Sequence, residues 1–235
     1  MFFHTHPYEP FLFEDATKLI VGTLPPPRFT IGELKEGDVN FCYGSRDGQL
    51  WPILDRIFEL NLDFATTEKA IQQRMDFLRD RKIGICDIVK SAERTKIDAS
   101  DLGMENIVLR DLFAYLQQSS KVETLLFTGG NSKNGPEYFF RKYLKEHGAT
   151  LELISNEVPR IHQFRLPRIK EEISLSSSEK TSIYKERIIK TVSLTAPSGA
   201  ANRAVGSLEA YKAMKNKNPE FNTIDFRVLQ YQKFF

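Results

Sequence analysis

An aspartate in a glycine-rich turn is the first residue of this sequence that could do chemistry. Asp47 lies in the stretch GSRDGQLWPIL, residues 44–54, directly before an apolar pattern with helical spacing. An aspartate before a helix can accept hydrogen bonds from the first free N–H groups, so Asp47 could be a helix N-cap. Because Gly48 permits unusual backbone angles, the same carboxylate could alternatively face a catalytic site. Both interpretations place a charged, flexible turn at the mouth of a rigid helix headed by Trp51.

Other candidate groups form weaker patterns. The loop GGNSKNG, residues 129–135, precedes a helical pattern and could bind a phosphate through backbone N–H groups. His4 and His6 form a His-x-His pair, but a metal site needs further ligands, so we expect both in a loop or terminal segment. Cys42 and Cys86 lack the neighbours of a metal quartet, which indicates two buried small side chains in a reducing compartment.

Short apolar runs predict the strands and longer periodic patterns predict the helices. The strands cover residues 18–22, 83–89, 122–130 and 185–194, with an edge strand at residues 149–154. The helices cover residues 49–60, 67–81, 107–117, 136–148, 203–215 and 223–235. The three prolines at residues 25–27 exclude a helix there, and residues 159–182 show the least regular pattern. Strands alternating with helices predict an α/β fold, a three-layer α/β/α sandwich around a mainly parallel four-stranded sheet, in one domain over residues 1–235.

Ligands of such sheets lie at the carboxyl ends of the strands. This rule selects the loops at residues 23–48, 90–101, 128–135 and 195–203, which carry the unusual residues of the sequence, so we expect one site. The net charge of +2 does not exclude nucleic-acid binding, which needs a local basic patch. The N-terminal segment lacks the features of a signal peptide and no apolar run reaches membrane-spanning length. We therefore expect a cytoplasmic protein that does not bind membranes.

The four loops together resemble the uracil-DNA glycosylase superfamily, nearest its mismatch-specific uracil and hypoxanthine-DNA glycosylase branches. GTLPP (residues 22–26) is similar to the first motif of that family, and FCYGSRDGQLWP (residues 41–52) to its aromatic loop. GICDIVKSAERTKIDASDL (residues 84–102) is similar to a segment of the hypoxanthine branch, and TAPSGAANR (residues 195–203) to the Pro-Ser loop. The resemblance covers about residues 18–215 and rests on the order of the four motifs.

The resemblance implies a monofunctional glycosylase that hydrolyses the N-glycosidic bond of a deaminated base flipped out of DNA. It implies no cofactor and no metal; the partner is DNA with a damaged or mismatched base, bound by a monomer. Asp47 would position the attacking water, and Tyr43 would stack on the base. The implied base-binding residues are Gly22, Thr23, Leu24, Tyr43 and Asn131, and the implied DNA-binding residues are Pro197, Ser198, Gly199, Ala200, Asn202 and Arg203.

Two positions depart from the family pattern. Many members carry Asn or Asp where this sequence has Leu24, and the hypoxanthine branch carries Asn where it has Gly48. Asp47 is the neighbouring group that could replace them. The same departures favour a second hypothesis, a non-catalytic module that binds damaged nucleotides or DNA on the same fold. A third hypothesis is a hydrolase of free nucleosides or nucleotides, for which binding to oligonucleotides would be weak and insensitive to salt.

Overall fold

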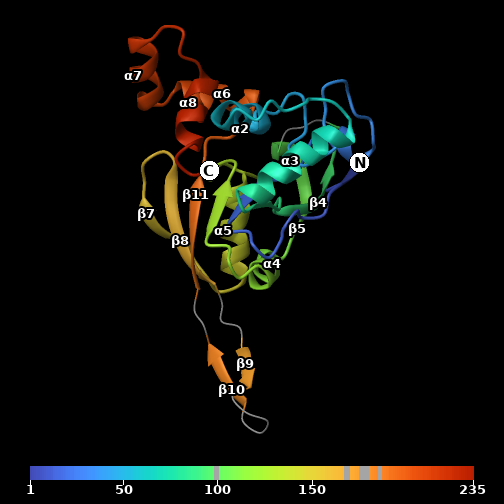
Figure 1. Ribbon diagram of the computed structural model, residues 1–235, viewed down its shortest axis with the longest axis vertical. Coiled ribbons are helices and arrows are strands. Elements are labelled where there is room, and N and C mark those ends of the chain that lie inside the picture. Colours follow the sequence, from blue (N-terminus) through green and yellow to red (C-terminus); the bar gives the residue numbers. More distant parts are fainter. Residues whose placement is uncertain (98–100, 167–169, 175–179, 185–186) are drawn as a thin grey trace.

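A six-stranded sheet forms the centre of the computed structural model, which describes residues 1–97, 101–166, 170–174, 180–184 and 187–235 (Figure 1). The strand order is β3-β2-β6-β11-β8-β7. The first four pair in parallel: β3 (Ile83–Ile85), β2 (Lys18–Val21), β6 (Thr124–Phe127) and β11 (Arg187–Ser193). β8 (Arg160–Leu166) and β7 (Glu152–Ser155) extend the sheet with antiparallel pairing. The predicted α/β class is confirmed, and the four predicted strands are the parallel ones in a sheet that is two strands wider.

Successive residues of β2 point to opposite faces of the sheet and enter two separate apolar cores. Leu19 and Val21 pack in a core with α4 (Leu112–Gln118) and α5 (Pro136–Glu146). Ile20 packs in the other core with α2 (Leu50–Phe58), α3 (Glu68–Asp80) and Tyr231 of α8 (Thr223–Tyr231). Helices therefore cover both faces of the sheet, which gives the expected three layers.

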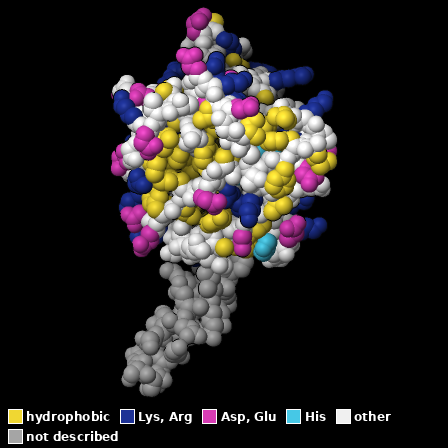
Figure 2. Space-filling model, turned by 90° about the vertical axis from the view of Figure 1, so that its right-hand side faces the viewer, with side chains coloured by type: hydrophobic (Ala, Val, Ile, Leu, Met, Phe, Trp, Pro, Cys, Tyr) yellow, Lys and Arg dark blue, Asp and Glu magenta, His cyan; other side chains and the backbone are white. Residues whose placement is uncertain are grey.

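A second, antiparallel sheet has the order β1-β4-β5, built from β1 (Phe2–Thr5), β4 (Val89–Arg94) and β5 (Met104–Leu109). Figure 2 shows the side of the molecule at the right of Figure 1, where apolar side chains gather in the middle and acidic and basic side chains are interspersed around them. A further pair, β9 (Lys170–Ser174) and β10 (Lys180–Tyr184), forms an antiparallel ribbon apart from the body of the protein (Figure 1).

Several predicted boundaries are wrong for local reasons. The helix predicted at residues 107–117 begins at Leu112, because residues 107–109 belong to β5. The three prolines do allow a short helix, α1 (Pro27–Thr30), since the third proline occupies its first turn. The segment 159–182 contains β8, β9 and β10, although it looked irregular. The helix predicted at residues 203–215 is two helices, α6 (Asn202–Gly206) and α7 (Glu209–Lys217).

The strand predicted at residues 83–89 ends at Ile85, and Val89 opens β4 of the second sheet. Short 3-10 helices at Asp101–Gly103 (η1) and Gly199–Ala201 (η2) interrupt two of the predicted site loops. In the part of the chain that the structure describes, no helix combines the length and apolar character needed to cross a membrane.

Candidate active site

The predicted site loops converge on one cavity of about 640 Å³, beyond the carboxyl ends of β2, β6 and β11. The lining comes from several parts of the chain: residues 23–26, 42–45, 47–50 and 196–200, with Asp87, Asp101, Thr128 and the N-terminal His6 and Tyr8. The predicted site residues on its walls are Thr23, Leu24, Tyr43, Asp47, Pro197, Ser198, Gly199 and Ala200. Motifs more than 150 residues apart in sequence thus share one pocket, as expected.

Asp87 organises the floor of the pocket. It follows β3, and its side chain is 7% exposed. Oδ1 accepts hydrogen bonds from the Gly22 backbone N–H (2.9 Å) and the Tyr43 hydroxyl (2.9 Å), and Oδ2 lies 3.0 Å from His6 Nε2. These contacts satisfy a buried carboxylate that would otherwise be costly. Asp87 therefore orders the loops around it.

Tyr43 lies in the pocket wall with its hydroxyl directed to the floor. The Oη atom bonds Asp87 and also lies 3.2 Å from Thr128 Oγ1. Burial and the adjacent Asp87 raise the pKa of the Tyr43 hydroxyl well above its usual value, so it is a neutral donor. Gly22 makes this arrangement possible, since a Cβ at residue 22 would lie 2.1 Å from the tyrosine oxygen. The predicted base-binding role of Gly22 is thus one of space and of a backbone donor.

His6 is a pocket residue that the sequence analysis missed. We expected His4 and His6 in a loop or terminal segment, but His4 lies in β1 and both side chains are buried. His6 contacts Asp87 through Nε2, and Tyr8 N donates to its Nδ1 at 3.1 Å. Burial, with Arg94 nearby, lowers the pKa of His4 to about 4, so His4 is neutral at physiological pH. The segment FFHT gives no clear signal of this burial, since His4 is the one buried residue among the four of β1.

Asp38 holds the loop that carries the predicted catalytic residue. Its carboxylate accepts two hydrogen bonds from Arg28, at 2.7 and 2.8 Å, and one each from the backbone N–H groups of Lys35 and Arg46. Burial opposes ionisation, but these donors lower the pKa of Asp38 to about 2. The loop is therefore a fixed structure rather than the flexible turn that its glycines indicated.

Asp47 reaches the pocket at its rim. The side chain is 73% exposed, and Oδ2 lies 3.4 Å from Arg28 Nη2. It is not the helix cap, because Gln49 occupies the N-cap of α2 and no side chain caps that end. Gly48, next to Asp47, forms an isolated antiparallel bridge with Ser198. The glycine-flanked turn thus connects the aromatic loop to the Pro-Ser loop.

The Pro-Ser loop is fixed from the C-terminal side by α8. The buried Arg227 guanidinium donates to Ala196 O (2.8 Å), Ser198 O (3.2 Å) and Asn202 Oδ1 (2.8 Å). From the other side, Gln49 N donates to Pro197 O at 2.9 Å. Pro197, Ser198, Gly199 and Ala200 consequently form one wall of the pocket mouth.

Four predicted site residues lie outside the pocket lining: Gly22, whose contact with Asp87 is described above, and Asn131, Asn202 and Arg203. Asn131 is exposed in the loop before α5, and Arg203 is exposed on α6. Asn202 has a structural contact, since its Oδ1 accepts from both Arg227 and the Thr223 hydroxyl. In the loop after β6 it is Asn134 that is buried, and its Nδ2 donates to Asp101 O at 2.8 Å.

Asp101 is a second pocket residue that the sequence analysis missed. It lies in η1 between β4 and β5 and lines the cavity. The Thr23 hydroxyl donates to its Oδ1 at 3.0 Å. Burial raises the pKa of Asp101 to about 6, and the negative Asp87 adds to the effect. A carboxyl that titrates near neutral pH in a pocket is typical of functional sites.

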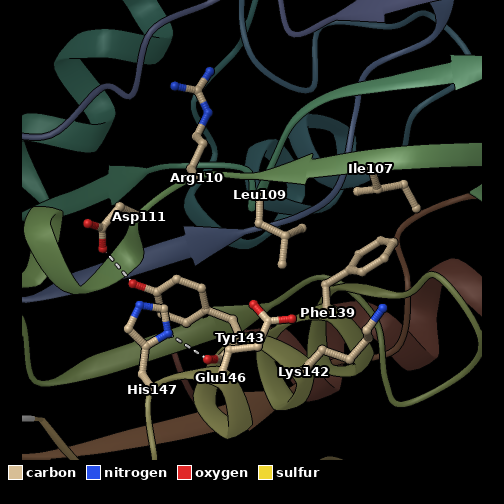
Figure 3. A pocket seen from close by; sticks show the side chains of 9 residues that line it. All are labelled: Ile107, Leu109, Arg110, Asp111, Phe139, Lys142, Tyr143, Glu146 and His147. Carbon is tan, nitrogen blue, oxygen red and sulfur yellow. Dashed lines mark hydrogen bonds between the residues drawn. The ribbon is translucent and has the colours of Figure 1, made fainter.

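A smaller hollow of about 340 Å³ lies between β5, the start of α4 and α5 (Figure 3). The Tyr143 hydroxyl in this hollow already makes two hydrogen bonds within the protein, because it donates to Asp111 and accepts from Phe113 N. Figure 3 shows the Arg110 side chain directed away from the other labelled residues. Among the described residues, no group of three or more His, Cys, Asp or Glu side chains is placed to hold a metal ion.

Comparisons with known proteins give only weak structural similarity. No family model matches the chain, and no curated protein matches it. The solution NMR structure of a protein from Methanosarcina acetivorans, provisionally described as a uracil DNA glycosylase, is similar over 63% of this chain and 80% of its own, with 17% sequence identity and a TM-score of 0.44. A match at this TM-score carries no inference about fold or function, so we base the function on the pocket itself.

Proposed function

We propose that this protein hydrolyses the N-glycosidic bond of a deaminated base, uracil or hypoxanthine, flipped out of DNA, and leaves an abasic site. The observation that supports this function is the convergence of three resembling segments, residues 22–26, 41–52 and 195–203, on one pocket. Its volume of about 640 Å³ accommodates a base with its sugar and a water molecule.

The walls of the pocket suit an extrahelical base. Leu24, Pro25 and the Tyr43 side chain offer apolar surface, and Thr128 offers a hydroxyl that can read a base edge. Entry of a base removes it from water, which strengthens every polar contact inside the pocket. The Pro-Ser loop at the mouth is the segment that would contact the DNA backbone, through Ser198 and neighbouring backbone N–H groups.

Glycosidic cleavage needs a water molecule held near C1′ and stabilisation of the departing base anion. Three aspartates reach this pocket, Asp47 at the rim, Asp87 in the floor and Asp101 in the wall. Asp47 is the candidate that the sequence indicates. The contacts of the three carboxylates differ, and these differences decide which of them can hold the water.

A base-release assay tests the function. Labelled oligonucleotides that contain uracil, hypoxanthine or xanthine, single-stranded and in each mismatch, are incubated with the protein and then treated with alkali. We expect strand cuts at the position of the modified base. Ala200→Trp, which places a large ring at the exposed pocket mouth, is expected to reduce cutting at least 10-fold. Ala210→Trp, on an exposed face of α7 outside the pocket, is the matched control and is expected to cut like the wild type.

The other outcomes contradict the proposal in distinct ways. Binding to the oligonucleotides without release of any base would favour the module that only recognises damaged nucleotides. Hydrolysis of free deoxynucleosides, without release from oligonucleotides and without steep salt dependence of binding, would favour the nucleoside hydrolase. Equal activity of both tryptophan variants would place the chemistry outside this pocket.

A further inference from the structure

We infer that Asp101 is the residue that holds and deprotonates the attacking water in this pocket. The inference rests on the proposed function and names the catalytic carboxylate, which the resemblance did not place in this loop. It is carried by the contacts of the three pocket aspartates. A water-holding carboxylate must face the cavity, be shielded from bulk solvent and keep an oxygen available for the water.

Asp87 does not meet these conditions. Its two oxygens share contacts with Gly22 N, Tyr43 Oη and His6 Nε2, all between 2.9 and 3.0 Å. Movement of a water into this cluster would displace one of these donors and disturb the floor. Asp87 is a positioning residue that fixes Gly22 and Tyr43.

Asp47 does not meet the conditions either, because its carboxylate is too exposed to solvent. With 73% of its side chain exposed, the Asp47 carboxylate is open to bulk solvent, which competes for its hydrogen bonds. Arg28 Nη2 lies 3.4 Å from its Oδ2 and takes up part of the remaining contact surface. Its place at the rim therefore keeps this carboxylate away from the enclosed part of the pocket.

Asp101 combines the three conditions. Its side chain lines the cavity, and the Thr23 hydroxyl bonds one carboxylate oxygen, Oδ1, at 3.0 Å. Asn134 fixes the backbone from behind through the Asp101 carbonyl (2.8 Å) and the Met104 carbonyl (3.4 Å). Thr23 belongs to the first motif, so the carboxylate is oriented by the segment that also forms the pocket wall. A carboxylate held by one neutral donor can still accept a hydrogen bond from water on its other oxygen.

The electrostatic surroundings agree with this role. The pKa of Asp101 is raised to about 6, chiefly by burial; the Thr23 hydrogen bond and Arg94 oppose this rise, and the charge of Asp87 adds to it. Asp87 is itself paired with His6, and Arg94 bonds His4. Because its pKa of about 6 lies below 7, Asp101 is ionised at pH 7 and yet is a stronger base than a solvated aspartate.

The proposed reaction is the hydrolysis of the C1′–N bond. The water oxygen forms a bond to C1′, the C1′–N bond breaks, and its electron pair leaves with the base as an anion. The proton of the water passes to the Asp101 carboxylate, which then releases it to solvent, while the base anion takes up a proton. The products are an abasic deoxyribose and the free neutral base.

Asp101→Asn tests the inference under single-turnover conditions. We expect a fall in the rate of base release of about 10²–10⁴-fold, the usual contribution of a general base, with oligonucleotide affinity unchanged. Folding is monitored in parallel. Because the folded pKa of Asp101 is raised from 3.8 to about 6, its ionisation lowers the stability as pH rises between these two values, and the full cost remains at higher pH. The asparagine variant should therefore melt at or above the wild-type temperature at pH 8. Asp80→Asn, which removes an exposed carboxylate at the end of α3, is the control and should retain wild-type activity.

The pH dependence separates catalysis from structural support. The wild-type rate should rise with pH through a group of pKa about 6. Thr23→Val removes the donor that favours the charged form, so the acidic limb of the rate profile should move to higher pH. If the rate of Thr23→Val instead changes by the same factor at every pH, with the acidic limb unmoved, the inference is contradicted.

Two results would overturn it. If the wild type releases a base and Asp101→Asn keeps that activity, Asp101 is not the base, although the proposed function stands. Loss of activity in Asp47→Asn together with full activity in Asp101→Asn would return the role to the rim carboxylate. A wild type that releases no base overturns the function and this inference together.

Discussion

Gly22→Ala is expected to lower the free energy of unfolding by about 4 kcal/mol, because the added methyl group has no room. An alanine Cβ would lie 2.1 Å from Tyr43 Oη, 2.8 Å from Asp87 Oδ1 and 3.0 Å from Thr128 Oγ1. Relieving this overpacking costs about 1–3 kcal/mol. The displaced tyrosine hydroxyl also loses its hydrogen bond to a charged acceptor, worth about 1.5–3 kcal/mol. For a chain of this length the melting temperature should fall by about 10 °C.

Urea unfolding followed by fluorescence measures this change, since the sequence has one tryptophan, Trp51, and it is 1% exposed in the core below the pocket. Gly206→Ala is the matched control, because a Cβ there meets no atom within 4 Å. Its cost should be close to zero. Gly22→Ala combined with Tyr43→Phe removes the nearest clashing atom and should recover at least 1 kcal/mol of the loss, on the order of the couplings that contacting residues show.

A cost for Gly22→Ala below about 1 kcal/mol would refute the close packing of Gly22 against Tyr43, because overpacking of this degree is expected to cost more. Equal stability losses with and without the Tyr43→Phe change would refute the specific claim that the tyrosine hydroxyl sets the limit. In either case the floor of the pocket would differ from the one described.

Two further perturbations test the loops around the pocket. Asp38→Asn should cost about 2–4 kcal/mol in urea unfolding at pH 7, since it leaves the Arg28 guanidinium without its carboxylate. Because the folded pKa of Asp38 is lowered to about 2, the stabilisation is present above its unfolded pKa and disappears as pH falls through 2; a wild-type acid titration without this loss would contradict it. Arg227→Met removes the donors to Ala196 O and Ser198 O, so cleavage by protease in the Pro-Ser loop should accelerate and base release should fall at least 10-fold. An unchanged digestion pattern would show that the loop holds its shape without the arginine.

The parallel core of this fold could be predicted because burial on both faces leaves a plain signal. KLIV at residues 18–21 and TLLF at residues 124–127 are short apolar runs, as expected for strands covered by helices on each side. The second sheet gives no such signal. β4 has the sequence VKSAER and buries the polar residues Ser91 and Arg94 among its apolar ones, so the segment looked like a loop.

The site was predictable in its location but not in its contacts. Loops at the carboxyl ends of strands were expected to meet, and they do. His6 was missed because it directly follows β1, a strand that was not recognised. Asp101 lies at the end of the predicted site loop 90–101, but no local pattern distinguished it from the other polar residues of that loop. The role of Gly48 was also hidden, since its bridge to Ser198 joins segments 150 residues apart and no local pattern reports such a pairing.

The contacts by which α8 fixes the Pro-Ser loop affect the order in which parts of the protein can form during synthesis. Gln230 accepts from Thr195 N, and the Tyr231 hydroxyl donates to Thr195 O, beside the contacts of Arg227. At synthesis rates of about 5–20 residues per second, the ribosome completes the first motif at least about 10 seconds before α8 exists. The nascent chain can form its central strands during that interval. Its pocket mouth closes only when residue 231 has emerged, so binding of any substrate must follow release of this segment from the ribosome.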